Sequence, residues 1–212
     1  YTILYKKLIK YKHNIYYYIN IMNNKLEIIY GPMFSGKTTK LIHLYNEKVK
    51  EFGQYKCIAF NYTLDKRYSS KSEIVSHDGL RINCELLFDI RDFIDNPNNN
   101  ARLKNINYIF INEAQFFPDL LNIILFITNI LNKNVILCGL DLDFKKNKFG
   151  EILDLIPFSN KIHKMTGKCN TKNCNNPSIY SYLTIKYNSQ LLIGNDVYIP
   201  LCEDCYNLKE IK

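Results

Sequence analysis

The sequence predicts an α/β fold in which a parallel sheet carries helices on both faces and a small subdomain follows it. Short apolar runs alternate with segments whose apolar residues recur at helical spacing, as in βαβ units. A glycine-rich turn joins the first apolar run to the first helical segment. After about residue 166 the pattern changes to cysteines, turn residues and polar–apolar alternation. The 212 residues, 47% of them hydrophobic, suffice for one ordinary domain with a small appendage.

Each predicted strand is a short apolar run bounded by polar residues or glycine. The first run, Leu26–Tyr30, ends at Gly31, and the last ends at Gly139. Runs this short and this apolar are typical of strands that are buried on both faces. The predicted strands cover residues 26–30, 55–60, 107–112 and 134–139.

The helices are predicted from apolar residues three and four positions apart. The first covers residues 37–52 and stops at Gly53, a common helix terminator. Residues 86–94 show the same spacing, and a further helix is expected around residues 118–131. The Asn-rich segment 95–100 is predicted to be a loop.

The net charge of +8 is unevenly distributed. Residues 1–21 contain four lysines and no acidic residue, so they supply half of it. We expect Met22 to be the natural start and residues 1–21 to be an extension outside the two folded parts, 22–166 and 167–212. The remaining chain is only mildly basic, which weakens the case for nucleic acid as a partner. No apolar run reaches the roughly 18–20 residues of a membrane-spanning helix.

The seven cysteines divide into two groups. Their odd number and the lack of a secretory pattern argue against a disulfide scaffold and favour a cytoplasmic protein. Cys57, Cys84 and Cys138 are scattered singly and are predicted to be small buried residues. The other four form two pairs separated by 27 residues, a spacing typical of a structural Cys₄ zinc site, and four reduced thiols without metal are the alternative. This predicted zinc site consists of Cys169, Cys174, Cys202 and Cys205.

The glycine-rich turn, residues 31–38, fits the pattern G-x-x-x-x-G-K-[ST] between a strand and a helix. Its glycines allow successive backbone N–H groups to face phosphate oxygens at the positive end of the helix. Lys37 would neutralise the terminal phosphates, and the Thr38 hydroxyl would ligate Mg²⁺. The motif therefore predicts binding of a nucleoside triphosphate. The expected phosphate-binding residues are Gly31, Pro32, Met33, Phe34, Ser35, Gly36, Lys37 and Thr38.

A second strand is expected to deliver an acidic group to the same edge of the sheet. Residues 108–111 are apolar, and Asn112 and Glu113 follow at the strand's carboxyl end. An ATPase would use Glu113 to orient water, whereas a kinase would use it to accept a proton from a substrate hydroxyl. The alternative is a solvated loop acid.

Five motifs occur in a fixed order along the chain: Gly31–Thr38, Asp65–Ser70, Ser76–Asp78, Asn112–Pro118 and Leu140–Phe144 followed by Phe149-Gly150. In these motifs and their order the chain resembles one family, the cellular and poxvirus type of thymidine kinase. The resemblance covers about residues 25–206, and it implies a P-loop NTPase-type sheet with a C-terminal zinc-held lasso. It also implies that ATP phosphorylates thymidine.

The resemblance implies roles for individual residues. Glu113 is similar to the catalytic base, Arg67 to the arginine that steadies the transferring phosphoryl group, and Lys37 to the catalytic lysine. The ATP-binding residues outside residues 31–38 would be Asp65, Lys66, Arg67, Asn112, Glu113, Ala114 and Gln115. The nucleoside would be bound by Met33, Phe116, Phe144, Gln190, Leu191, Leu192, Ile193, Gly194 and Tyr198. Without the family, the two phenylalanines would be ordinary core residues and residues 190–198 a plain β-hairpin.

The main departure from the family is Asn112, where Asp is usual. Asparagine keeps an oxygen ligand for hydrated Mg²⁺ but loses the charge, which predicts weaker metal binding. Ala114 replaces a common glycine, and four residues separate Cys169 from Cys174 where two are more usual.

The resemblance further implies a homotetramer that is inhibited by thymidine triphosphate, with neither nucleic acid nor a membrane as partner. The rival prediction is a P-loop ATPase whose zinc ribbon acts on nucleic acid. Against it, the segment around the cysteines lacks a stripe of Lys and Arg with interleaved aromatic residues. A third possibility, for which Asn112 is the only reason, is an inactive relative that binds nucleotides.

Overall fold

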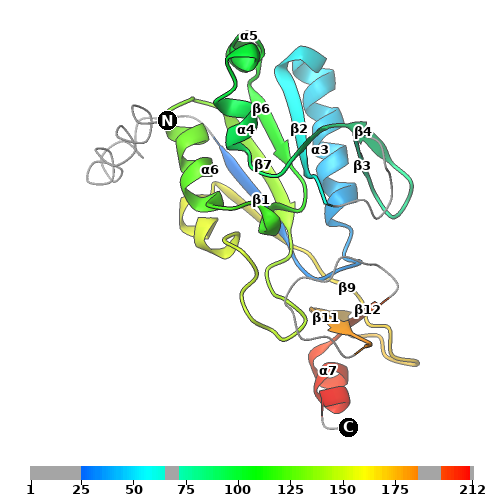
Figure 1. Cartoon of the computed structure of the whole chain (residues 1–212). Helices are drawn as coiled ribbons and strands as arrows, with labels where there is room; N and C mark the ends of the chain where they lie inside the picture. Colours follow the sequence, from blue (N-terminus) through cyan, green and yellow to red (C-terminus); the bar gives the residue numbers. More distant parts are fainter. Residues whose placement is uncertain (1–24, 65–71, 186–196, 211–212) are drawn as a thin grey trace.

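The computed structural model describes residues 25–64, 72–185 and 197–210. In this part of the chain the main element is a six-stranded sheet in which every pair of neighbouring strands is parallel (Figure 1). The parallel sheet confirms the predicted fold class. Its strands, in spatial order, are β5 (Glu85–Leu87), β2 (Cys57–Tyr62), β6 (Tyr108–Ile111), β7 (Asn134–Gly139), β1 (Leu26–Tyr30) and β8 (Lys161–Lys164).

Alternate residues of the central strands enter two separate cores, one on each face of the sheet. On one face Ile28, Ile109 and Leu137 pack with helix α6 (Leu120–Asn129) and the short helix α4 (Arg91–Ile94). On the other face Ile29, Phe110 and Ile136 pack with helix α3 (Lys37–Phe52) and the hairpin of β3 (Glu73–Val75) and β4 (Arg81–Asn83). The two cores explain why these strands are apolar at most positions on both faces.

The chain after β8 forms small elements at one end of the molecule, away from α5 (Asn100–Asn105) at the other (Figure 1). Within the described residues they comprise two two-stranded sheets and a terminal helix. These elements are β9 (Gly167–Lys168), β10 (Pro177–Ser178), β11 (Tyr180–Leu183), β12 (Tyr198–Leu201) and α7 (Glu203–Glu210). Short 3₁₀ helices cover Gln54–Lys56, Pro97–Asn99, Ala114–Phe116 and Leu153–Phe158.

The prediction of a helix over residues 86–94 is wrong. Residues Glu85–Leu87 form the edge strand β5, which pairs with the end of β2, and only Arg91–Ile94 are helical. The Asp89 carboxylate accepts the backbone N–H of Arg91 at 2.9 Å and so starts the helix late. A short apolar run can form either a helix or a strand, and here residues 85–87 form a strand because they pair with the edge of β2.

Two further boundaries differ from the sequence prediction. The 3₁₀ turn after Gly53 delays strand β2 to residue 57, and the predicted loop over residues 95–100 includes another 3₁₀ turn. The edge strand β8 was not predicted, because its pattern is charged and three of its four residues are exposed.

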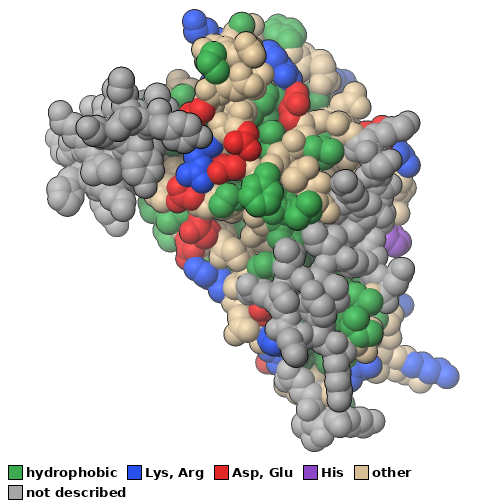
Figure 2. Space-filling view, in the orientation of Figure 1, with side chains coloured by type: hydrophobic (Ala, Val, Ile, Leu, Met, Phe, Trp, Pro, Cys, Tyr) green, Lys and Arg blue, Asp and Glu red, His purple; other side chains and the backbone are tan. Residues whose placement is uncertain are grey.

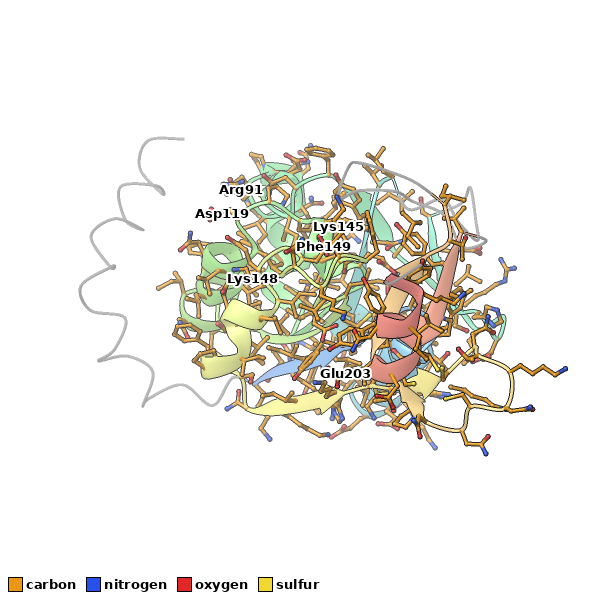
Figure 3. All side chains as sticks on the ribbon, turned by 90° about the horizontal axis from the view of Figure 1, so that it is seen from below. Arg91, Asp119, Lys145, Lys148, Phe149 and Glu203 are labelled. Carbon is orange, nitrogen blue, oxygen red and sulfur yellow. The ribbon has the colours of Figure 1, made fainter. Side chains whose placement is uncertain are left out.

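The face of the molecule in Figure 2 carries basic and acidic side chains next to one another. Among the ion pairs of the described residues, the Arg91 guanidinium lies 2.6 Å from the Asp89 carboxylate and 3.4 Å from that of Asp119. Figure 3 labels Arg91 and Asp119 in a view turned by 90°. None of the helices that the structure describes has the length and apolar character needed to cross a membrane.

Candidate active site

The glycine-rich loop joins β1 to α3 and depends on glycine at both ends. A Cβ at Gly31 would lie 2.2 Å from the carbonyl oxygen of Met165, so no side chain fits. Gly36 has open space around it but a φ of +80°, which disfavours residues with a side chain. The glycine at position 31 is therefore required by packing, and that at position 36 by backbone conformation.

The loop is closed by bonds to one of its own carbonyl groups. The Lys37 ammonium donates to the Pro32 carbonyl oxygen at 2.6 Å, and the Ser35 hydroxyl donates to the same oxygen at 2.8 Å. Both side chains are buried. The arrangement holds the Lys37 charge inside the loop, where a phosphate would lie.

Asn112, at the carboxyl end of β6, is the centre of a buried polar network. Its side-chain oxygen accepts bonds from the Thr38 hydroxyl at 3.3 Å and the Cys138 thiol at 3.1 Å. Its amide nitrogen donates to the side-chain oxygen of Asn61 at 3.0 Å. The structure thus brings Thr38 and Asn112 together, because β1, β7 and β6 are neighbours whose carboxyl ends share one edge.

The partners of Asn112 differ from what the sequence predicted. Cys138 is buried as predicted but also carries a hydrogen bond, and Cys84 is only half-buried. Asn61 was missed, since its place beside Asn112 follows only from the pairing of β2 with β6. The one feature of the sequence that could have indicated Asn61 is its position, as a single polar residue near the end of the apolar strand β2.

Glu113 has a left-handed backbone, with φ 53° and ψ 43°, and its side chain is buried. Such a backbone is costly for a residue with a side chain and is found where the surroundings enforce it, often at functional sites. The Gln115 amide donates to the Glu113 carboxylate at 2.7 Å, and its oxygen accepts the Leu140 N–H at 3.0 Å. A Cβ at Gly139 would lie 2.2 Å from that same oxygen. Gly139 therefore makes room for the side chain that orients Glu113.

Three residues predicted to bind the nucleoside lie in one apolar cluster. Met33 and Tyr198 are buried there, and Phe144 packs against them with its ring centroid 6.5 Å from that of Tyr198. The Met33 N–H donates to the Ser181 hydroxyl at 2.9 Å, which ties the glycine loop to β11. The cluster therefore joins the glycine loop, the loop after β7 and the C-terminal elements.

The fourth, Phe116, belongs to a different aromatic group. Its ring lies 5.3 Å from that of Tyr62 and 5.5 Å from that of Phe149. Phe149 is on the loop after β7 that also carries Lys145, as Figure 3 shows. Sequence reasoning did not assign Tyr62 or Phe149 to a site, although Phe149 stands in one of the ordered motifs. The remaining predicted site residues lie outside the described part of the chain: Asp65, Lys66, Arg67, Gln190, Leu191, Leu192, Ile193 and Gly194.

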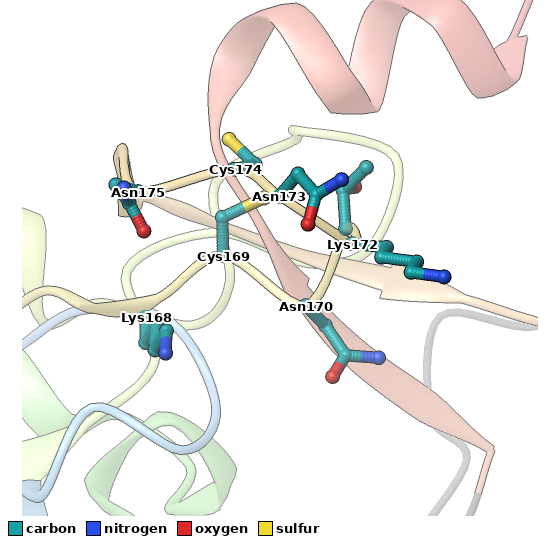
Figure 4. Close-up of a pocket in the computed structure, with 8 residues that line it drawn as sticks. Lys168, Cys169, Asn170, Lys172, Asn173, Cys174 and Asn175 are labelled. Carbon is teal, nitrogen blue, oxygen red and sulfur yellow. The ribbon is translucent and has the colours of Figure 1, made fainter.

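The four C-terminal cysteines converge although 27 residues separate the two pairs. Their sulfur atoms all lie within 4.8 Å of one another, and those of Cys174 and Cys202 are 3.7 Å apart. A tetrahedral zinc ion with Zn–S bonds of about 2.3 Å needs sulfur atoms about 3.8 Å apart. Figure 4 shows Cys169 and Cys174 at the two ends of a turn that lines a hollow. The sulfur geometry fits zinc.

The pKa values of two of these thiols, Cys169 and Cys174, also fit a bound cation. Burial raises the pKa of Cys169, but hydrogen bonds from the backbone of Cys202 and Thr171 outweigh it and lower the pKa to about 6. A backbone hydrogen bond from Asn176 lowers the pKa of Cys174, but desolvation and the three other thiols raise it to about 12. One thiolate therefore forms readily and the next does not, unless a metal ion compensates the charge.

A strand, a glycine loop of this pattern and a helix, set at the carboxyl edge of a parallel sheet, define the class of P-loop α/β proteins. In this chain a four-cysteine centre is joined to that framework through Met33 and Ser181.

Comparisons with known proteins identify the family within this class. A family model described as thymidine kinase matches residues 24–206. A thymidine kinase of Choristoneura fumiferana entomopoxvirus is 35% identical over 195 residues, covering 86% of this chain and 96% of the relative. Thymidine kinase 1 of Dictyostelium discoideum is 34% identical, covering 86% and 78%. The cytosolic thymidine kinase of Bos taurus is 34% identical, covering 86% and 71%. The chain belongs to the thymidine kinase family.

Proposed function

We propose that this protein is a thymidine kinase, which transfers the γ-phosphate of ATP to the 5′-hydroxyl of thymidine and yields thymidine monophosphate for DNA precursor salvage. The observation that carries the proposal is the placement of Glu113. Its buried carboxylate is oriented by a hydrogen bond from Gln115. In the sequence Glu113 directly follows Asn112, whose side chain accepts a hydrogen bond from Thr38 of the glycine loop. Family membership supports thymidine as the substrate.

Glu113 is the proposed catalytic base. The 5′-oxygen forms a bond to the γ-phosphorus, the bond from that phosphorus to the β–γ bridging oxygen breaks, and ADP leaves with the electron pair. A sugar hydroxyl is too weak an acid to ionise beforehand, so Glu113 positions it and receives its proton late. The hydrogen bond from Gln115 fixes the orientation of the Glu113 carboxylate.

The phosphates are held by the glycine loop, with Lys37 as its charge. Mg²⁺ bound with ATP would neutralise charge on the β- and γ-phosphates, and Thr38 and Asn112 would hold it through oxygen ligands. The two oxygens are already adjacent, at 3.3 Å. Arg67, Asp65 and Lys66 complete the proposed ATP site by resemblance to the family.

The thymine base is proposed to bind between Met33, Phe144 and Tyr198. By resemblance to the family, Phe116 and residues 190–194 are proposed as further nucleoside-binding residues. Flat and flexible apolar side chains suit the faces of a base. Deoxyuridine should be a weaker substrate, because the loss of one methyl contact costs about 1–3 kcal/mol of discrimination. We also propose a cytoplasmic homotetramer that is inhibited by thymidine triphosphate in the substrate site, with no nucleic acid partner.

The proposal is tested with purified protein, ATP, Mg²⁺ and thymidine. Formation of thymidine monophosphate, lost in the variant Glu113→Ala, is the expected result. ATP hydrolysis stimulated by DNA, without a nucleoside product, would instead favour the ATPase that acts on nucleic acid. If the protein shows neither activity, it is an inactive relative of the family. Deoxycytidine as the better substrate would overturn the thymine pocket.

We expect Asn112→Asp to lower the Mg²⁺ concentration needed for half-maximal activity. A carboxylate adds a charge next to the metal, and the Thr38 hydroxyl can still donate to it. The buried carboxylate cannot donate to Asn61, but the Asn61 amide can turn and donate to it instead. The measurement is a Mg²⁺ titration of thymidine phosphorylation, accompanied by a titration of nucleotide binding. An unchanged or higher requirement would contradict this account of Asn112.

A further inference from the structure

The loop after β7, which carries Phe144, contains a tightly built turn over residues 143–147. The Asp143 carboxylate accepts the backbone N–H groups of Lys145 and Asn147, both at 2.8 Å. Lys146 at its tip has a left-handed backbone, with φ 63°. Such a conformation in a residue with a side chain persists where surrounding contacts enforce it. The turn is thus closed by its own hydrogen bonds, and further contacts reach it from outside.

Those contacts come from the C-terminal helix α7. The Tyr206 hydroxyl donates to the backbone carbonyl oxygen of Phe144. The Lys146 ammonium lies 4.1 Å from the centroid of the Tyr206 ring, close enough for a cation–π interaction, and donates to the Asn207 side chain at 2.8 Å. In Figure 3 the helix that begins at Glu203 lies next to the loop with Lys145 and Phe149. The helix thus contacts the turn at both Phe144 and Lys146.

Tyr206 is itself held by the cysteine centre. It is 2% exposed, and it directly follows Cys205. Its N–H donates to the Cys202 carbonyl oxygen at 2.9 Å, and its side chain packs in the same cluster as Cys169 and Leu201. One side chain therefore connects the four-cysteine centre to the backbone of Phe144.

We propose that Tyr206 is a positioning residue for the nucleoside: it transmits the rigidity of the four-cysteine centre to the turn that places Phe144 in the thymine pocket. Lys146 clamps the same turn from its tip. The inference rests on the proposed function, because the pocket is that of the proposed substrate. It assigns to the C-terminal helix a part in nucleoside binding and none in the phosphate chemistry at Lys37 and Glu113.

The test is Tyr206→Phe, which keeps the buried ring and the cation–π contact and removes only the hydroxyl bonded to Phe144. The matched control is Tyr182→Phe, which removes a hydroxyl from a ring that packs against Tyr206 at 5.5 Å. We expect Tyr206→Phe to raise the KM for thymidine roughly three- to tenfold, with kcat, the KM for ATP and the zinc content unchanged. Lys146→Met should raise the same KM, and Tyr182→Phe should leave it unchanged.

Hydrogen exchange of residues 141–149 provides a second measurement, independent of activity. It should be faster in Tyr206→Phe than in the wild type and in Tyr182→Phe. An unchanged thymidine KM with unchanged exchange would overturn the inference. An equal rise in both KM values with a lower melting temperature would also overturn it, since that outcome indicates a purely structural role. A wild-type protein that does not phosphorylate thymidine would overturn the proposed function, and exchange alone would then decide whether Tyr206 holds the turn.

Discussion

Glu113→Gln is expected to lower kcat for thymidine phosphorylation by roughly 10²–10⁴-fold. Glutamine has the same shape, and its amide oxygen can still accept the bond from Gln115, so the left-handed turn should survive. The amide cannot take the proton of the 5′-hydroxyl. We therefore expect the loss in kcat, with little change in ATP binding or in the KM for thymidine.

Steady-state kinetics and a direct measurement of nucleotide binding check this prediction. Glu51→Gln is a suitable control, because Glu51 lies exposed near the end of α3, where it pairs with Lys48 at 2.7 Å. It should leave kcat unchanged. A decrease of less than tenfold in Glu113→Gln would show that Glu113 is not the base, and a loss of ATP binding would show that it acts through the glycine loop.

Cys169→Ser is expected to abolish zinc binding and to unfold the C-terminal elements locally. Structural zinc contributes about 10–16 kcal/mol in zinc-finger peptides, and four sulfur atoms within 4.8 Å of one another offer it a complete tetrahedron. The described part of these elements buries few large apolar side chains, namely Leu183, Tyr198, Leu201 and Tyr206. Without the metal we expect the thymidine KM to rise far more than the KM for ATP.

The control for this variant is Cys84→Ser, at a half-buried cysteine outside the centre. Metal analysis should give one zinc per chain in the wild type and in Cys84→Ser, and almost none in Cys169→Ser. Hydrogen exchange should accelerate over residues 167–185 and 197–210 only in Cys169→Ser. Full zinc retention in Cys169→Ser would exclude Cys169 as a ligand. This test is informative because four residues separate Cys169 from Cys174, where two are more usual in the family.

The four central strands of the sheet and its two main helices were predictable because each central strand is largely buried on both faces. A run such as Tyr108–Ile111 is apolar throughout, and its short length between polar residues favours a buried strand. The glycine loop was also predictable, because its backbone accepts few residue types other than glycine at positions 31 and 36. By contrast, the edge strands β5 and β8 have weak patterns, and pairing with β2 and β1 defines them.

The candidate site was predictable only in part. The pattern identified Lys37, Thr38 and Glu113, because phosphate binding and proton transfer need those residue types at the ends of strands. It did not identify Asn61 as a partner of Asn112, nor Gln115 as the group that orients Glu113. Both contacts join side chains whose proximity depends on strand order or on a left-handed turn.

The sequence by itself therefore determined the α/β framework and the glycine-rich loop, and it singled out the four cysteines that converge, since each of these is encoded by a local pattern or by a characteristic spacing. Only the tertiary structure decided which distant groups meet. Tyr206 and Phe144 are 62 positions apart, and Met33 and Ser181 are 148 apart. Such contacts leave no local pattern, because their energy is gained only after the sheet and the cysteine centre have brought the chain segments together.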